Sequence, residues 1–288
     1  VCSSDLPESI QHAGDASGHV EIAAEGVRKG FAGRAVLRGV DLSIRAGEIV
    51  AVVGGSGCGK TVLLNLITGL LPVDSGRVLV ADYAAPRGSR GDLPLVDIAT
   101  LGDEELDRVR LRWAVVFQKN ALFSGTVEEN INLWLREHTA MAAAKIRQRV
   151  RESLAAVALD VDDVLGKQRE QLSGGMAKRV AIARAIAVDP GVIFYDEPTT
   201  GLDPVVSGHV HELIWSTHHR PREDGTRRTT VIVTHDKDLL RRLRPRVVML
   251  DHGLVAFDGP YEAFTASTVE AARQYLAAMP VLQMRGAE

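Results

Sequence analysis

The stretch IVAVVGGSGCGKT, residues 49–61, decides the fold of this chain. Residues 49–53 form an unbroken apolar run rich in β-branched side chains, which is typical of a strand buried on both faces. Glycines follow at once, and residues 62–71 then carry apolar side chains at helical spacing. A glycine, four residues and Gly-Lys-Thr between a strand and a helix is the pattern of a phosphate-binding loop. The segment therefore predicts an α/β fold built on a P-loop NTPase core.

The chemistry of nucleotide binding explains the residue types in this loop. Glycines let the backbone curl until its amide N–H groups converge on phosphate oxygens, and the N-terminus of the following helix adds positive potential. Lys60 can reach the β- and γ-phosphates of ATP, and the Thr61 hydroxyl can bind Mg²⁺. Cys58 is interpreted as a small filler rather than a nucleophile, because phosphoryl transfer needs no thiol. The predicted nucleotide-binding residues of this segment are Gly54, Gly55, Ser56, Gly57, Cys58, Gly59, Lys60, Thr61 and Val62.

A second apolar run ends in two acids. Residues 192–195, VIFY, directly precede Asp196 and Glu197. Acids at the carboxyl end of a parallel strand lie beside the phosphate loop. We therefore expect Asp196 to hold Mg²⁺, directly or through water, and Glu197 to activate the attacking water as a general base.

The bulk composition limits the classes of function. The chain has 288 residues, a formal net charge of -3 and 45% hydrophobic residues, which is ordinary globular composition. Because the net charge is slightly negative, the chain lacks the overall basic field that would indicate a nucleic-acid partner. No apolar run approaches the about 18 residues of a membrane span, so any membrane process must be served through a partner. Two cysteines exclude a disulfide framework and favour a reducing compartment.

The remaining pattern predicts strands on both sides of a central helical block. This arrangement favours an α/β core with an inserted helical subdomain. We expect strands over 20–27, 36–44, 113–117, 192–195 and 231–233, a hairpin of 247–250 with 254–258, helices over 62–71, 103–112, 127–136, 140–157, 176–188 and 269–278, and a loop over 84–92.

The segment LSGGM, residues 172–176, narrows the prediction to one family. It opens a helix, and the Ser173 hydroxyl with the amides of Gly174 and Gly175 can bind a γ-phosphate. Here the chain resembles the nucleotide-binding subunits of ABC transporters, whose signature reads Leu-Ser-Gly-Gly-Gln. In that family the signature binds the ATP held by the other protomer. The resemblance thus implies a homodimer that closes on two ATP molecules.

Four further positions match motifs of the same family in the same order. Gln118 matches the glutamine of the loop that senses Mg²⁺ and the transmembrane partner, which implies catalytic and metal-binding roles. Asp203 matches the D-loop at the dimer interface, and His235 matches the switch histidine that contacts the γ-phosphate. Phe31 matches the aromatic residue that stacks on adenine. Val62 departs from the pattern, because a second hydroxyl is common after Thr61, and its loss removes an α-phosphate contact.

The resemblance also implies a domain organisation. It covers residues 19–262 as an ABC ATPase domain, with an antiparallel β subdomain and a helical subdomain at about 119–187. Residues 263–288 are a C-terminal helical extension, which either contacts the sister ATPase or packs on its own core. Residues 1–18 are expected to be a disordered tail. Within it, residues 1–6 can be read as translated sequencing-adapter DNA, or as natural tail.

Several segments resemble the ATPase of the Mla phospholipid-trafficking system in particular. They are FQKNALF at 117–123, LREHT at 135–139, the signature with Met176, and YDEPTTGLDP at 195–204. This resemblance implies an ATPase on the cytoplasmic face of the bacterial inner membrane, beneath two permease subunits and with a periplasmic MCE lipid-binding protein. The cargo would be phospholipid.

Other classes of function remain as alternatives. An importer for a small polar solute, such as an amino acid, is the main one. A soluble ABC ATPase is disfavoured because the chain has one phosphate loop and no coiled-coil heptads. An inactive scaffold is disfavoured because Lys60, Glu197 and His235 are all present. The basic loop over 221–228 is interpreted as solvated rather than as a contact for anionic headgroups.

Overall fold

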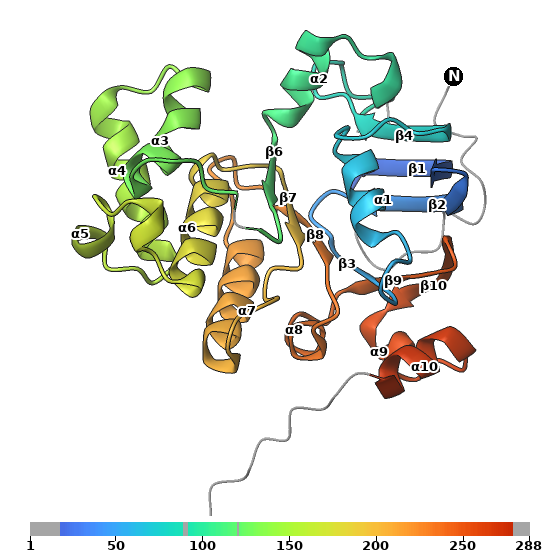
Figure 1. Ribbon diagram of the computed structural model, residues 1–288. Coiled ribbons are helices and arrows are strands. Elements are labelled where there is room, and N and C mark those ends of the chain that lie inside the picture. Colours follow the sequence, from blue (N-terminus) through green and yellow to red (C-terminus); the bar gives the residue numbers. More distant parts are fainter. Residues whose placement is uncertain (1–17, 89–91, 120, 279–288) are drawn as a thin grey trace, which may run out of the picture.

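The structure is a computed structural model that describes residues 18–88, 92–119 and 121–278. Two sheets and a group of helices make up the molecule (Figure 1). The larger sheet has six strands in the order β10-β9-β3-β8-β7-β6. Those strands are β10 (Leu254–Pro260), β9 (Arg246–Asp251), β3 (Ile49–Val53), β8 (Thr229–Val233), β7 (Val192–Asp196) and β6 (Trp113–Val116).

Parallel pairing in this sheet brings the predicted motifs to one edge. β3 pairs in parallel with β8 and β9, and β7 pairs in parallel with β6 and β8. Every residue of β7 and β8 is buried, as the apolar runs over 192–195 and 231–233 predict, and β8 begins two threonines earlier than expected. The carboxyl ends of β3, β7 and β8 therefore lie side by side, where ligands bind in open α/β sheets.

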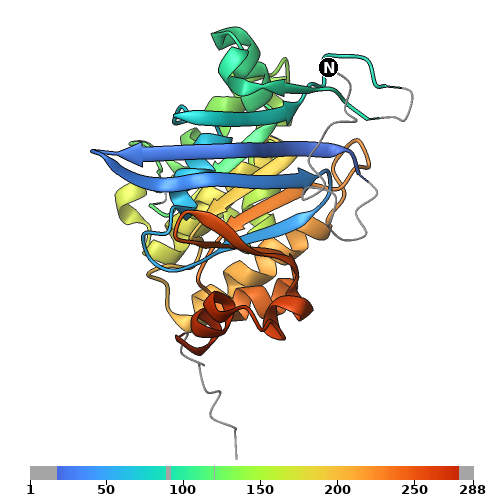
Figure 2. The same ribbon diagram turned by 90° about the vertical axis from the view of Figure 1, so that its right-hand side faces the viewer.

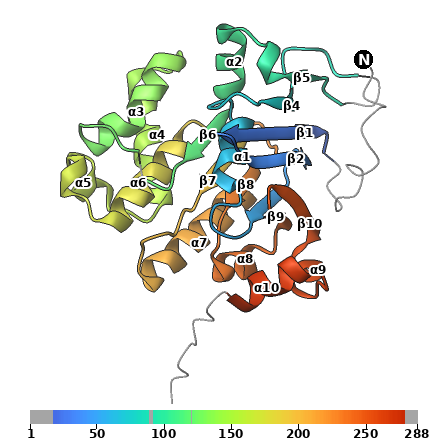
Figure 3. The same cartoon turned by 45° about the vertical axis from the view of Figure 1, so that its right-hand side comes forward.

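The smaller sheet is antiparallel, in the order β2-β1-β4-β5. It consists of β1 (Val20–Phe31), β2 (Arg34–Arg45), β4 (Ser75–Ala81) and β5 (Leu95–Asp97). β1 and β2 run beyond the expected 20–27 and 36–44, because a tight turn at Ala32 and Gly33, both with positive φ, joins them. Figures 2 and 3 show this long blue hairpin beside α1 (Lys60–Ile67). The sequence patterns did not predict β4 or β5.

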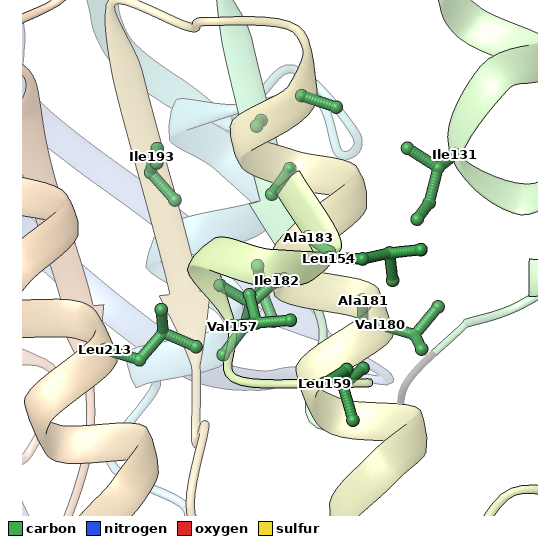
Figure 4. Packing of buried hydrophobic residues seen from close by; sticks show 14 of the residues in the cluster. Ile131, Leu154, Val157, Leu159, Val180, Ala181, Ile182, Ala183, Ile193 and Leu213 are labelled. Atoms are coloured by element: carbon green, nitrogen blue, oxygen red, sulfur yellow. The ribbon is translucent and has the colours of Figure 1, made fainter. Parts of the chain in front are cut away.

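Between β6 and β7 the chain forms a separate helical layer. Its helices are α3 (Val127–His138), α4 (Ala143–Ala156), α5 (Val161–Val164) and α6 (Gly174–Ala187). Apolar side chains of α4 and α6 meet β7 and α7 (Pro204–His219) in one buried cluster (Figure 4). Leu154, Val180 and Ile193 are each fully buried in it, so the layer shares a core with the large sheet.

The C-terminal segment packs on its own chain. α9 (Tyr261–Thr265) and α10 (Glu270–Ala278) follow the β9–β10 hairpin. Phe264 and Ala272 are fully buried against Val53 and Met249 of the large sheet. The described part of the extension thus packs on the chain's own core, and contact with a sister ATPase stays a prediction.

The other expected elements differ from the structure mainly at their ends. α1 begins at Lys60, two residues earlier than expected, because the helix starts inside the phosphate loop; it ends at Ile67, before the left-handed Gly69. The charged helix α2 (Asp103–Arg110) is present, whereas α7 and α8 (Lys237–Leu243) were not predicted. The expected loop over 84–92 lies partly outside the described residues, as do the tail up to residue 17 and the extension beyond 278.

The basic loop over 221–228 is less solvated than its composition suggests. Arg228 is 6% exposed and pairs with Asp189, and Arg222 donates to the Asp189 carbonyl oxygen at 3.2 Å. These two arginines anchor the loop, while Arg227 stays exposed. The interpretation of the loop as solvated holds for Pro221 and for residues 223–227, which are exposed, but not for Arg222 and Arg228, which pair with the half-buried Asp189. Among the described residues, no helix has the length and hydropathy needed to cross a membrane.

Candidate functional site

The phosphate loop joins β3 to α1 in a conformation that only glycine tolerates at two positions. Gly54 has φ +145°, and a Cβ there would lie 2.3 Å from the Leu250 carbonyl oxygen. Gly59 has φ +104°, and its Cβ would lie 2.6 Å from a methyl group of Leu37. The Lys60 ammonium folds back over the loop and donates to the carbonyl oxygens of Gly54 at 2.9 Å and Gly55 at 3.1 Å. The predicted loop therefore exists, with its lysine at the mouth.

The other residues of the segment support this loop. The Cys58 thiol is half-buried, and burial raises its pKa, so it is protonated at neutral pH and suited to filling space. Val62 packs partly buried against the core of the β sheets.

Thr61 and Asp196 meet across the two strand ends. The Thr61 hydroxyl donates to Asp196 Oδ1 at 3.3 Å, and Asp196 is 5% exposed. Burial raises the pKa of this carboxyl, although the Thr61 hydrogen bond opposes the rise. A bound cation would relieve that burial cost.

The donor set fits magnesium carried in with a nucleotide. A hydroxyl and a carboxylate are hard oxygen ligands, and Mg²⁺ commonly takes only one or two from protein, with phosphate and water completing its shell. Over the described ranges, no group of three or more His, Cys, Asp or Glu residues forms a closed metal cage.

Glu197 is held in a strained conformation beside His235. Its φ of 46° lies in the left-handed region, and its amide donates to the Val233 carbonyl oxygen at 2.8 Å. Its Oε2 lies 2.7 Å from His235 Nδ1 and accepts from the Thr200 hydroxyl at 3.2 Å. The Glu197 side chain is 11% exposed and the imidazole 62%, so a nearly buried carboxylate faces an accessible ring. Such strain is often kept at functional sites.

A buried hydrogen-bonded group behind His235 was missed by sequence reasoning. His211 Nε2 lies 2.7 Å from Asp236 Oδ2, which also accepts from the Thr199 hydroxyl at 2.8 Å. Burial alone would raise the pKa of Asp236, but the bonds from His211 and the Leu239 amide lower it to about 2. The group ties α7 to the residue after His235. The sequence holds no pattern that would identify His211, a single histidine in a helix, as a member of this hydrogen-bonded group.

The C-terminal helix reaches the same strand ends. The Tyr275 hydroxyl lies 3.4 Å from the Thr234 carbonyl oxygen, and the Lys237 ammonium donates to the Leu276 carbonyl oxygen. Burial raises the pKa of Tyr275. The apolar spacing of the sequence predicted this helix, but it did not predict that the helix contacts the residue before His235.

Gln118 follows β6 at the edge of the same site. It is exposed, and its carbonyl oxygen accepts from the Lys178 ammonium at 3.0 Å. Phe31 ends β1 with its ring 45% exposed and the Lys29 ammonium 5.6 Å from the ring centre. Both side chains are therefore accessible to a ligand.

The signature residues form a second, separate surface. Ser173 caps α6 by accepting from the Met176 amide at 3.2 Å, and Gly174 beside it is exposed. A Cβ on Gly175 would lie 2.7 Å from Val206 of α7, whose own cap is Asp203. Among the described contacts, no hydrogen bond or ion pair joins these residues to the phosphate loop. The predicted site is thus divided between the sheet edge and the start of α6.

This fold and site define a class of protein. A glycine-rich loop with its lysine, a buried carboxylate pair and an imidazole at the carboxyl edge of a parallel sheet form the nucleotide site of a P-loop NTPase. The ABC transporter family model matches residues 37–200, more than half of the chain.

Individual relatives and solved structures agree with this match. The chain is 35% identical to the protein TRIGALACTOSYLDIACYLGLYCEROL 3, chloroplastic, of Arabidopsis thaliana, covering 89% of this chain and 73% of that one. It is 38% identical to the methionine import ATP-binding protein MetN of Caulobacter vibrioides, covering 88% and 72%. The dimeric ATP-binding cassette MJ0796 bound to ADP and Pi superposes with a TM-score of 0.69 at 31% identity, covering 83% and 98%.

This chain belongs to the ABC transporter family and is an ATP-hydrolysing subunit of it. The expected P-loop NTPase fold and the expected ATPase activity are therefore confirmed. Cassettes of this family work as dimers with membrane permease subunits.

Proposed function

We propose that this ATPase powers phospholipid movement between bacterial membranes. It would sit at the cytoplasmic face of the inner membrane, beneath two permease subunits that work with a periplasmic MCE protein. The observation that carries the proposal is the signature LSGGM, with Met176 where most ABC ATPases have glutamine, together with LREHT at 135–139. A relative named after a galactolipid supports a lipid cargo.

Import of a small polar solute is the second candidate. A methionine import protein is 38% identical over 259 residues, against 35% over 268 residues for the relative with the lipid name. Because cargo is selected mainly by the membrane partner, the ATPase sequence alone favours lipid only through the subfamily segments.

The proposed chemistry begins with binding of ATP at the sheet edge. The amides of the phosphate loop and the Lys60 ammonium bind the phosphates, and the exposed Phe31 ring stacks on the adenine. Thr61 and Asp196 would hold Mg²⁺, which neutralises phosphate charge when bound. Gln118 would stand beside this group from the end of β6.

Hydrolysis then depends on the buried carboxylate. Glu197 Oε2 accepts the proton of the attacking water, and its bond of 2.7 Å to His235 orients both groups. His235, being 62% exposed, is free to contact the γ-phosphate. Ser173, Gly174, Gly175 and Asp203 act on the ATP of the partner protomer, so two chains complete each site.

The cargo and partners are tested by isolating the tagged chain from native membranes in mild detergent, with mass spectrometry of proteins and lipids. We expect a permease, an MCE protein and phospholipid in amounts that the Lys60→Ala chain also recovers, since assembly does not need hydrolysis. A permease with a periplasmic solute-binding protein would replace the lipid proposal by the import one. Recovery of no permease would contradict both.

A further inference from the structure

A buried lysine connects the helix that begins with the signature to the loop of Gln118, and its charge also acts on Asp196. Lys178, on the second turn of α6, is 2% exposed, although lysine is almost never fully buried without a partner. Its ammonium donates to the carbonyl oxygens of Phe117 at 3.1 Å and Gln118 at 3.0 Å. These acceptors lie just beyond the last residue of β6, where ladder pairing with β7 has ended. Lys178 therefore joins the helix that starts with the signature to the backbone of Gln118.

Two arginines extend this connection along the loop after Gln118. Arg184 of α6 donates to the Ala121 carbonyl oxygen at 3.0 Å, and Arg169, just before the signature, donates to the Leu122 carbonyl oxygen at 2.8 Å. Four carbonyl groups of this loop thus bond to cations from the segment that carries Ser173. Because of these bonds, a displacement of the segment over 169–184 would also displace the loop that contains Gln118.

The charge of Lys178 is kept at a cost to folding. Burial lowers its pKa to about 8, while the negative charge of Asp196 acts in the opposite direction. Asp196 in turn bonds to Thr61. An apolar side chain of similar length would fill the same space without this desolvation cost, so packing alone does not account for an ammonium here.

We propose that Lys178 is a positioning residue that ties the backbone of Gln118 to the signature helix. Displacement of that helix against a partner's ATP then moves Gln118 relative to Asp196 and Thr61. The inference rests on the roles proposed above for Gln118, Asp196 and the signature. It identifies the connection by which closure of the dimer reaches the magnesium ligands of the same chain.

The test compares Lys178→Met, Lys178→Arg and Arg179→Met in the full chain. Methionine keeps the length and apolar packing but removes the donor, and arginine keeps the charge. Arg179 is the matched control, because it also donates to a carbonyl oxygen, that of Ala158 at 3.0 Å, but inside the helical layer. Measurements are the melting temperature, hydrogen exchange of the peptide over 117–123, kcat, and the Mg²⁺ concentration for half-maximal rate.

We expect Lys178→Met to melt within a few degrees of wild type, because the lost bonds and the removed desolvation cost oppose each other. The amides of the loop should exchange faster, kcat should fall about tenfold or more, and more Mg²⁺ should be needed. Lys178→Arg should recover part of the rate, and Arg179→Met should behave as wild type in every measurement.

Wild-type exchange and wild-type Mg²⁺ dependence in Lys178→Met would overturn the proposal. So would an equal loss in Arg179→Met. If Lys178→Met does not fold, Lys178→Gln, which keeps a neutral donor, is measured in the same way. A Glu197→Gln chain runs alongside: normal turnover there would show that the site assignment itself has failed, whatever Lys178→Met does.

Discussion

The carboxyl edge of the large sheet and the start of α6 carry the two halves of the motif set, and they are built differently. At the sheet edge, Asp196 and Glu197 are buried and each is bonded within the chain. At the start of α6, Ser173 and Gly174 are exposed, and Ser173 bonds only to its own helix. One half is finished inside a single chain, and the other presents an anion-binding helix end to the outside. The difference supports the proposal that one chain holds ATP and that a second chain completes the site.

Glu197→Gln should give the largest effect of any single change, because it removes the base and leaves the fold intact. We expect turnover to fall by at least about 100-fold. ATP binding should persist, and dimers should accumulate with ATP. Phosphate release and size-exclusion chromatography measure the two effects. Glu104→Gln, an exposed acid on α2, serves as the control. Normal turnover in Glu197→Gln would show that the sheet edge is not the hydrolytic half.

Ser173→Ala should separate the two regions. It removes a hydroxyl from the exposed half without touching the phosphate loop, so ATP affinity should stay near wild type while turnover falls about tenfold. Titration with a fluorescent ATP analogue and a hydrolysis assay give the two numbers. Thr126→Ala removes an equivalent cap from α3, where the hydroxyl accepts from the Glu129 amide at 3.1 Å, and should leave turnover unchanged. If Ser173→Ala lost ATP affinity to the same extent as turnover, the claim that the phosphate loop and the start of α6 act separately would be contradicted.

Asp236→Asn should have the smallest effect on turnover of the three changes, and should instead lower the free energy of unfolding. The pKa of Asp236 is about 2 in the fold, below its ordinary 3.8, so the carboxylate stabilises the fold above pH 3.8 and loses that contribution as the pH falls towards 2. We expect about 1–3 kcal/mol lower stability at pH 7, with the gap to wild type narrowing below pH 4. Denaturant unfolding across this range measures it. Asp238→Asn, two residues on, is the control. A gap that does not change with pH would contradict the assigned bonds.

Sequence reasoning succeeded where one short segment dictates its own structure. Gly54 and Gly59 occupy conformations and spaces that no other residue fits, so their spacing alone marks the loop. Residues 192–196 are buried at every position, and an apolar run reports that directly. The bounds of the elements were less predictable, because β1 and β2 extend to a turn at Ala32 and Gly33, where Gly33 is the one turn-forming residue and Ala32 gives no sign of its positive φ.

What the sequence could not predict are contacts between distant segments. Lys178 lies 60 positions from its acceptor Gln118, and His211 lies 25 positions from Asp236. Neither residue type is unusual in a helix, so only the packing of α6 and α7 on the sheet reveals their partners. The same holds for Arg222 and Arg228, whose composition indicates a solvated loop although Asp189 binds both.

The division of the site between two chains is tested most directly by mixing two defective chains. Lys60→Ala damages only the phosphate loop, and Ser173→Arg damages only the signature end. In a mixed dimer, the intact loop of the second chain meets the intact signature of the first. We predict that single-turnover hydrolysis of ATP by the mixture clearly exceeds the mean of the two separate chains. A rate equal to that mean would contradict the account, because each chain would then hold a complete site of its own.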